Sequence, residues 1–336
     1  MSLSQTGDRL PASGAARGRQ RAPRGLAPIL LPTFSLLIVL LAINYFNPRA
    51  ISYFGFNLML NLAVPVTLAT MAQLCVITVN DLDLSIGAYV GFIACVAATL
   101  LASRPWVGAA IILGSVALYA ALGALVYLRQ LPSIVVTVGM SFVWLGLALL
   151  ILPTPGGQAP GWLHALVSIS PPFVPFPILA ALVIAGVMHV VLMQTAFGTL
   201  LRGAGGNEAA MARAGWSMLR IKITAYALAG LFGSLAGMAL VGVTTSADAN
   251  MANNYTLLAV AGAILGGAEF TGGRISPIGA VIGALTLQLA AVALNFFRLP
   301  DLLPGFRIPS EWQVGAQGLI LILILAVRAV ISRSEP

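Results

Sequence analysis

Charged residues are scarce in this chain of 336 residues, in which 9 acidic and 17 basic side chains amount to 8%. An ordinary soluble domain is about 25% charged, so this composition excludes a water-soluble globular protein. Cysteine is also rare, and two residues, Cys75 and Cys95, exclude a disulfide-stapled scaffold. The hydrophobic content of 59% excludes an intrinsically disordered chain.

The residues that usually perform catalysis are rare as well. Histidine occurs only at His164 and His189, and the chain has neither a His-Glu-x-x-His motif nor a Gly-x-Ser-x-Gly elbow. The single lysine, Lys222, has no glycine loop before it, so a P-loop for ATP is absent. We therefore expect no enzyme and no metal or cofactor site. Any ATP-driven motor would have to be another chain.

Long apolar runs make up most of the sequence. Runs such as 36–43 and 319–326 are continuous and do not alternate with polar residues, which favours helices over strands. A membrane-spanning helix needs about 20 apolar residues, so the sequence predicts an all-α polytopic membrane protein. We expect about ten spans, the eighth too short to cross alone: 27–46, 57–79, 84–102, 107–128, 134–152, 177–194, 223–244, 257–268, 276–297 and 313–331.

The basic residues indicate the orientation of these spans. With the N-terminus in the cytoplasm, 13 of the 17 basic residues fall on the cytoplasmic side, as the positive-inside rule requires. Both termini are then cytoplasmic. Residues 1–26 are predicted to be a disordered tail before one transmembrane domain, 27–331. The basic residues are scattered between apolar runs, so we expect the lipid bilayer, and no nucleic acid, as a partner.

Two acidic residues interrupt the apolar sequence between the second and third spans. Asp81 and Asp83 lie in Val79-Asn-Asp-Leu-Asp-Leu-Ser-Ile-Gly87. Because a charge at the bilayer centre costs about 2.5–3.5 kcal/mol, such residues suggest a transport role. A solvated turn that caps the third span is the alternative. With nearby polar residues they form our candidates for a translocation path: Asn57, Asn61, Gln73, Asn80, Asp81, Asp83 and Ser85.

The longest predicted cytoplasmic loop, 195–222, contains the pattern of a complete short helix. Asn207 is a favoured N-cap, and Glu208 suits the positive N-terminal end of a helix. Arg213 suits the negative end, and Gly215 is a common C-terminal stop. Such a helix has no lipid core to pack on. It would lie on the bilayer surface or dock into a partner through small side chains such as Ala209 and Ala210.

Four blocks of the sequence occur in a familiar order. The first, 76–87, contains Asp83-Leu84-Ser85 followed by Gly87, and the second is 137–158. The third, 198–240, contains Gly205-Gly-Asn-Glu-Ala-Ala210, and the fourth, 255–283, contains Gly272-Gly-Arg274. In these blocks the chain resembles the membrane permease subunits of bacterial ABC sugar importers of the ribose, xylose and galactose type. The likeness covers roughly residues 55–330.

This resemblance implies a division of labour in the bacterial inner membrane. Two permeases, identical or different, would form the pore for a sugar, and two ATP-binding cassette ATPase subunits would drive it. A periplasmic sugar-binding protein would deliver the substrate, and the Pro-rich outer segment 153–176 would help to dock it. The resemblance assigns the short helix to coupling with the ATPase, through Asn207, Glu208, Ala209, Ala210, Arg213 and Gly215.

The chain departs from the family where Asn80-Asp81 replaces a frequent Gly-Gly pair, which leaves the identity of the sugar open. The alternative function is a stand-alone, ion-coupled carrier or channel for a small polar solute. Asp81 and Asp83 would then be the coupling carboxylates.

Overall fold

The computed structural model describes residues 27–296, together with residues 315, 318 and 319. The predicted tail 1–26 and nearly all of the predicted tenth span, 313–331, lie outside these residues. Within the described part the chain forms α-helices joined by turns and short 3-10 or π segments, so the predicted all-α fold is confirmed.

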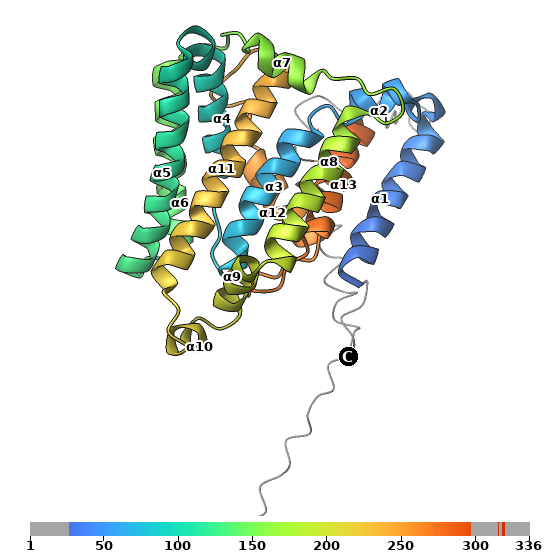
Figure 1. Cartoon of the computed structure of the whole chain (residues 1–336). Coiled ribbons are helices and arrows are strands. Elements are labelled where there is room, and N and C mark those ends of the chain that lie inside the picture. Colours follow the sequence, from blue (N-terminus) through green and yellow to red (C-terminus); the bar gives the residue numbers. More distant parts are fainter. Residues whose placement is uncertain (1–26, 297–314, 316–317, 320–336) are drawn as a thin grey trace, which may run out of the picture.

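Nine helices of the described chain stand side by side in one bundle (Figure 1). They are α1 (Ala27–Phe46), α3 (Ala63–Thr78), α4 (Ile86–Val96), α5 (Pro105–Arg129), α6 (Ser133–Ile151), α8 (Phe176–His189), α11 (Met218–Thr244), α12 (Tyr255–Leu265) and α13 (Pro277–Phe296). Four further helices are α2 (Tyr53–Met59), α7 (Gly161–Val167), α9 (Ala196–Gly206) and α10 (Glu208–Arg213). Helix α7 lies at one end of the bundle and α10 at the other (Figure 1).

The helices account for the first nine predicted spans. Among the described residues, five helices are long and apolar enough to cross a membrane: α1, α5, α6, α11, and α8 with its π-helical extension to Gln194. The pair α2 and α3 can count as a sixth, and α4, α12 and α13 are shorter apolar helices. The eighth predicted span is short as expected, at Tyr255–Leu265.

The second predicted span, 57–79, corresponds to two helices with a bend between them. Helices α2 and α3 meet at an angle of 48° across residues 60–62. Pro65 explains the break, because a proline ring clashes with the carbonyl four residues earlier, here that of Asn61, and supplies no N–H for it. The chain therefore bends one turn before Pro65.

Helix α3 lies at the centre of the bundle, and each of its sixteen residues is buried. It packs against α8, α11, α12 and α13. Helix α11 comes close to its neighbours through glycines: a Cβ added at Gly230 would lie 2.7 Å from the Tyr119 Cβ, and one at Gly237 would lie 2.7 Å from the Ile93 Cβ. Larger side chains at these positions would push the helices apart.

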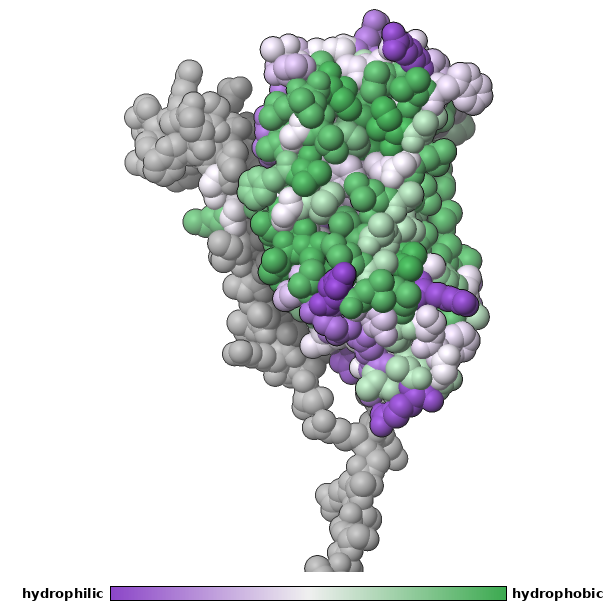
Figure 2. All heavy atoms as spheres, turned by 90° about the vertical axis from the view of Figure 1, so that its left-hand side faces the viewer, coloured by the Kyte–Doolittle hydropathy of each residue, from purple (hydrophilic) through white to green (hydrophobic). Residues whose placement is uncertain are grey.

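The outer face of the bundle is apolar. Seen from the side of α5 and α6, hydrophobic side chains form a broad band, and hydrophilic residues gather towards its two ends (Figure 2). Exposed members include Leu113 of α5, and Phe142 and Leu150 of α6. Such a band matches the hydrocarbon core of a bilayer, so the protein is a multi-pass membrane protein.

The Pro-rich segment 153–176 contains more structure than a loop. It includes helix α7, whose His164 has its Nδ1 atom 2.9 Å from the carbonyl oxygen of Gly242 at the end of α11. Gly156 and Ala247 exchange two backbone hydrogen bonds of 2.9 and 2.8 Å. These contacts fix the segment onto the bundle end opposite α10.

Candidate functional site

The chain between α3 and α4 is an unwound segment, residues 79–85. It begins where Asn80 takes a left-handed backbone conformation with φ of 62°. The N–H groups of Asn80 and Asp81 donate to the carbonyl oxygens of Ile77 and Val76, at 3.0 and 3.2 Å. This is the hydrogen-bond pattern of a Schellman turn, in which asparagine tolerates the left-handed position. The turn ends α3 and directs the chain back into the bundle.

Side chains from other helices satisfy the backbone of the unwound segment. The Leu82 N–H donates to Ser133 Oγ at 3.1 Å, and the Leu84 N–H donates to Thr137 Oγ1 at 3.0 Å. With its amide oriented to suit, Gln73 donates to the Asp83 carbonyl at 2.9 Å and accepts from the Asp83 N–H at 3.2 Å. Non-helical backbone inside a membrane bundle needs such partners, because no lipid group can supply them.

Asp83 is fully buried at the start of α4. Its Oδ1 accepts from the backbone N–H and the hydroxyl of Ser85, both at 2.7 Å, and its Oδ2 accepts from the Tyr119 hydroxyl at 2.8 Å. The helix N-terminus also favours a negative charge. The alternative prediction of a solvated turn is therefore wrong for Asp83. Its second part, a cap on the third span, agrees with the structure, because the carboxylate accepts from the Ser85 N–H at the start of α4.

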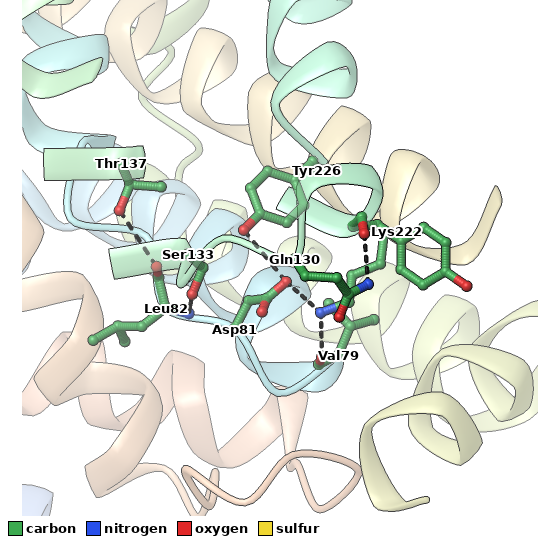
Figure 3. A network of polar contacts seen from close by, with 9 residues as sticks. Val79, Asp81, Leu82, Gln130, Ser133, Thr137, Lys222 and Tyr226 are labelled. Carbon is green, nitrogen blue, oxygen red and sulfur yellow. Dashed lines mark hydrogen bonds and ion pairs between the residues drawn. The ribbon is translucent and has the colours of Figure 1, made fainter. Parts of the chain in front are cut away.

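Asp81 forms a nearly buried ion pair with Lys222 (Figure 3). The Lys222 Nζ lies 2.7 Å from Asp81 Oδ2 and also donates to the Val79 carbonyl at 3.3 Å, and both charged side chains are 9% exposed. Tyr226, one turn further along α11, donates its hydroxyl to the same carboxylate oxygen at 3.3 Å. Close packing permits this arrangement, because a Cβ added at Gly123 of α5 would lie 2.8 Å from the Lys222 carbonyl oxygen.

The sequence predicts a cytoplasmic loop over 195–222 that includes Lys222, and this prediction is wrong for Lys222, which lies in α11. The segment is mainly helical, because Thr195 caps α9 by accepting from the Gly198 N–H. Ser217 likewise caps α11 by accepting from the Arg220 N–H. Lys222 therefore belongs to the second turn of α11 and faces the unwound segment.

Helix α10 forms as the sequence predicted. The Asn207 Oδ1 accepts from the Ala210 N–H at 2.9 Å, and Gly215 closes the helix with φ of 86°. The N–H of Trp216 donates to the Met211 carbonyl at 3.1 Å, which completes a second Schellman turn. Every residue of α10 is at least partly exposed, and Met211 packs on the bundle, so its structure rests on its own caps and on one apolar contact.

An open pocket of about 340 Å³ separates α10 from the unwound segment. Its walls come from both elements, from the start of α11 and from the turn between α5 and α6. The polar residues of the lining are Asn80, Asp81, Gln130, Ser133, Glu208 and Lys222.

The other predicted path residues fall into two places. Gln73 and Ser85 are buried beside Asp83, whereas Asn80 is exposed at the turn. Asn57, on α2, and Asn61, at the bend, lie at the opposite end of α3. In the described part of the chain, no group of three His, Cys, Asp or Glu residues could hold a metal ion.

Sequence reasoning missed the partners of the unwound segment. These are Tyr119, Ser133, Thr137, Lys222 and Tyr226. Ser133 and Thr137 are four residues apart on an apolar helix, as are Lys222 and Tyr226, so each pair shares one helix face. This spacing was the available signal.

Comparison with known proteins places the chain in a family. Residues 55–325 match the family described as "Branched-chain amino acid transport system / permease component". The probable ABC transporter permease protein y4mJ of Sinorhizobium fredii is 28% identical over 331 residues, which cover 96% of each chain. No solved structure matches.

Two further relatives have substrates in their names. The ribose import permease protein RbsC of Escherichia coli K12 is 26% identical over 307 residues, 87% of this chain and 91% of that protein. The autoinducer 2 import system permease protein LsrC of Yersinia pseudotuberculosis is 27% identical over 314 residues, 91% and 84% of the two chains. Since the family match covers most of the sequence, the chain belongs to the branched-chain amino acid transport system permease component family.

Proposed function

We propose that this chain is the permease subunit of an ATP-binding cassette importer that moves a sugar, of monosaccharide size, across the inner membrane. The family description names amino acids, but similar proteins are named for ribose, autoinducer 2 and L-arabinose import. The apolar bundle supplies the membrane-spanning part, and a separate ATPase supplies the energy.

Helix α10 is the observation that carries this proposal. It is capped at both ends, exposed along its length and placed at one end of an otherwise apolar bundle. We assign it to coupling: Glu208 and Arg213 offer charges, and the alanines allow close approach, to a cleft on the ATPase. The end that carries α10 is then cytoplasmic, and the end that carries α7 faces the periplasmic sugar-binding protein. A second permease completes the pore.

The seven path candidates divide into roles under this proposal. Gln73, Asp83 and Ser85 position the unwound segment from inside the bundle. Asn80 and Asp81 line the open pocket and can meet a solute on the cytoplasmic side. Asn57 and Asn61 remain candidates for the opposite entrance.

The test is co-purification of the complete chain with its ATPase from native membranes, followed by reconstitution with the binding protein. Sugar uptake should require ATP. Glu208→Arg and Gly215→Trp should abolish uptake without loss of membrane insertion. Glu269→Arg is the matched control, because Glu269 is an exposed acid whose two side-chain partners, Arg274 and Thr271, are exposed as well, at 3.3 Å each.

Normal uptake by both α10 variants would exclude the coupling role of this helix. If the chain instead purifies alone and moves solute under an ion gradient, it is the stand-alone carrier. Asp81 and Asp83 would then be the residues to substitute.

A further inference from the structure

We infer that the Asp81–Lys222 ion pair transmits movement of the coupling helix to α6 through the unwound segment, so that these two residues couple ATP hydrolysis to gating. The inference rests on the proposed function. Neither residue belongs to the surface proposed to contact the ATPase. In this role both act by positioning other parts of the permease, apart from any contact of Asp81 with the solute.

The first connection runs from α10 to Lys222. Only residues 214–217 separate α10 from α11, and Lys222 is the fifth residue of α11. Because this connection is short and both helices are capped where they meet it, a displacement of α10 is transmitted to α11. Movement of α10 therefore moves the first turns of α11, on which Lys222 and Tyr226 share one face.

The second connection joins those turns to the unwound segment. Lys222 holds Asp81 and the Val79 carbonyl, and Tyr226 holds Asp81. The bonds lie at the near end of the segment, where Asn80 has reversed the chain (Figure 3). A displacement of α11 is thus applied to a stretch of backbone that has no helical hydrogen bonds of its own to resist it.

The third connection leads from the segment to α6. Ser133 and Thr137 of α6 bind the backbone N–H groups of Leu82 and Leu84. The opposite face of α6 is free within the described chain: Val135 is 65% and Phe142 is 71% exposed, and a Cβ added at Gly139 would meet nothing within 4 Å. Helix α6 can therefore shift when the segment pulls on it, and its free face is available to a neighbour across the pore.

The ion pair can also open, which a coupling element requires. Asp81 and Lys222 both line the open pocket beside α10. Water that enters this pocket can solvate the two charges when they separate, and this lowers the penalty that keeps a sealed pair closed. Asp83, by contrast, is enclosed by Ser85 and Tyr119 and has no such access.

The test measures ATP hydrolysis and uptake together in the reconstituted complex with its binding protein. Asp81→Asn and Lys222→Met should each lower the sugar taken up per ATP by about tenfold, within the range of coupling mutations, while hydrolysis continues. The double variant Asp81→Asn/Lys222→Met leaves no buried charge unpaired and should be as uncoupled as either single variant.

A purely structural role gives a different result. If removal of both charges restores uptake per ATP to the wild-type value, or if uptake and hydrolysis fall in proportion, the coupling inference is overturned. If the single variants do not assemble, uptake per ATP is measured in the double variant and in Tyr226→Phe, which keeps both charges. These two values then decide whether the coupling inference holds. Tyr226→Phe should lower uptake per ATP about twofold, because it removes one weak contact.

Controls separate this inference from the proposed function. The exposed pair Glu269–Arg274 is the matched control, and Glu269→Gln should leave uptake per ATP unchanged. Failure of the wild-type complex to couple uptake to ATP would overturn the proposed function itself. A wild-type complex that couples normally, beside variants that also couple normally, would overturn only the role of Asp81 and Lys222.

Discussion

The unwound segment 79–85 and the region of α10 interrupt the apolar sequence in similar ways but differ in burial. Each contains a Schellman turn with a left-handed residue, Asn80 in one and Gly215 in the other. In the unwound segment, other helices of the same chain hydrogen-bond the polar groups. In α10 the caps satisfy the helix ends, and every residue is at least partly exposed. The same local turn thus begins a buried, internally supported segment in one place and closes an exposed helix in the other, which we propose as the surface for recognition.

This difference predicts separate effects on stability. Substitutions that remove partners inside the bundle should lower the free energy of unfolding, whereas substitutions in α10 should act only when the ATPase is present. Thermal unfolding of the purified chain in detergent measures the first effect. The four substitutions that follow are ordered by the size of this loss.

Asp83→Leu should have the largest effect, a loss of about 3 kcal/mol or more. It leaves the Ser85 N–H buried without an acceptor and removes one partner from each of the hydroxyls of Ser85 and Tyr119, and unpaired buried groups are costly. The expected readout is a large fall in the unfolding midpoint. An unchanged midpoint would mean that the unwound segment is not held from inside, and the contrast with α10 would fail.

Gln73→Leu should cost about 2 kcal/mol. Leucine has a similar volume but releases both the N–H and the carbonyl of Asp83, which have no lipid substitute. Gln73→Glu is the sharper companion, because a carboxylate keeps the acceptor for the N–H and loses the donor to the carbonyl. If the leucine variant unfolds at the wild-type temperature, the bridging role of this amide is wrong.

Thr137→Val should cost about 1–2 kcal/mol, because it removes the acceptor for the Leu84 N–H and a longer hydrogen bond of 3.4 Å to the Leu82 carbonyl, and keeps the shape of the side chain. Ser141→Ala on the same helix is the matched control, since its hydroxyl bonds only to the Val138 carbonyl of its own helix. Equal midpoints for these two variants would show that the hydroxyl of Thr137 does not support the segment.

Asn207→Ala should have the smallest effect on global unfolding, below about 0.5 kcal/mol, because an exposed helix can fray without opening the bundle. Loss of the cap still destabilises α10 locally by about 1 kcal/mol. Uptake by the complete complex should therefore fall, and Asn207→Asp should restore it. A large shift in the unfolding midpoint would mean that α10, like the unwound segment, is part of the cooperatively folded bundle.

The sequence predicted those parts of the structure that depend on local signals. Apolar length predicted the spans, and the Asn207 and Gly215 caps predicted α10, because both depend on residues a few positions apart. The bend before Pro65 was missed, although the proline and its position predict it. The helix within the Pro-rich segment was also missed, because the many prolines indicate a loop, although they flank α7 and none lies within it.

The sequence predicted the position of the candidate site but not the residues that surround it. The segment itself was recognised from Asp81 and Asp83, but their partners come from distant helices. Lys222 is 141 residues away from Asp81 in sequence, and its charge made it appear to belong to a solvated loop. Burial of a charged residue depends on a partner that packing brings near, and the sequence alone does not contain that geometry.

Lys222 has one more consequence, since it is the only lysine side chain in the sequence. An amine-reactive reagent that acetylates lysine has a single side-chain target here, and the ion pair with Asp81 shields it. The rate of acetylation at Lys222, followed by peptide mass spectrometry, therefore rises with the fraction of time that the pair is separated. Separation of the Asp81–Lys222 pair can thus be followed in the unaltered chain, without an engineered label.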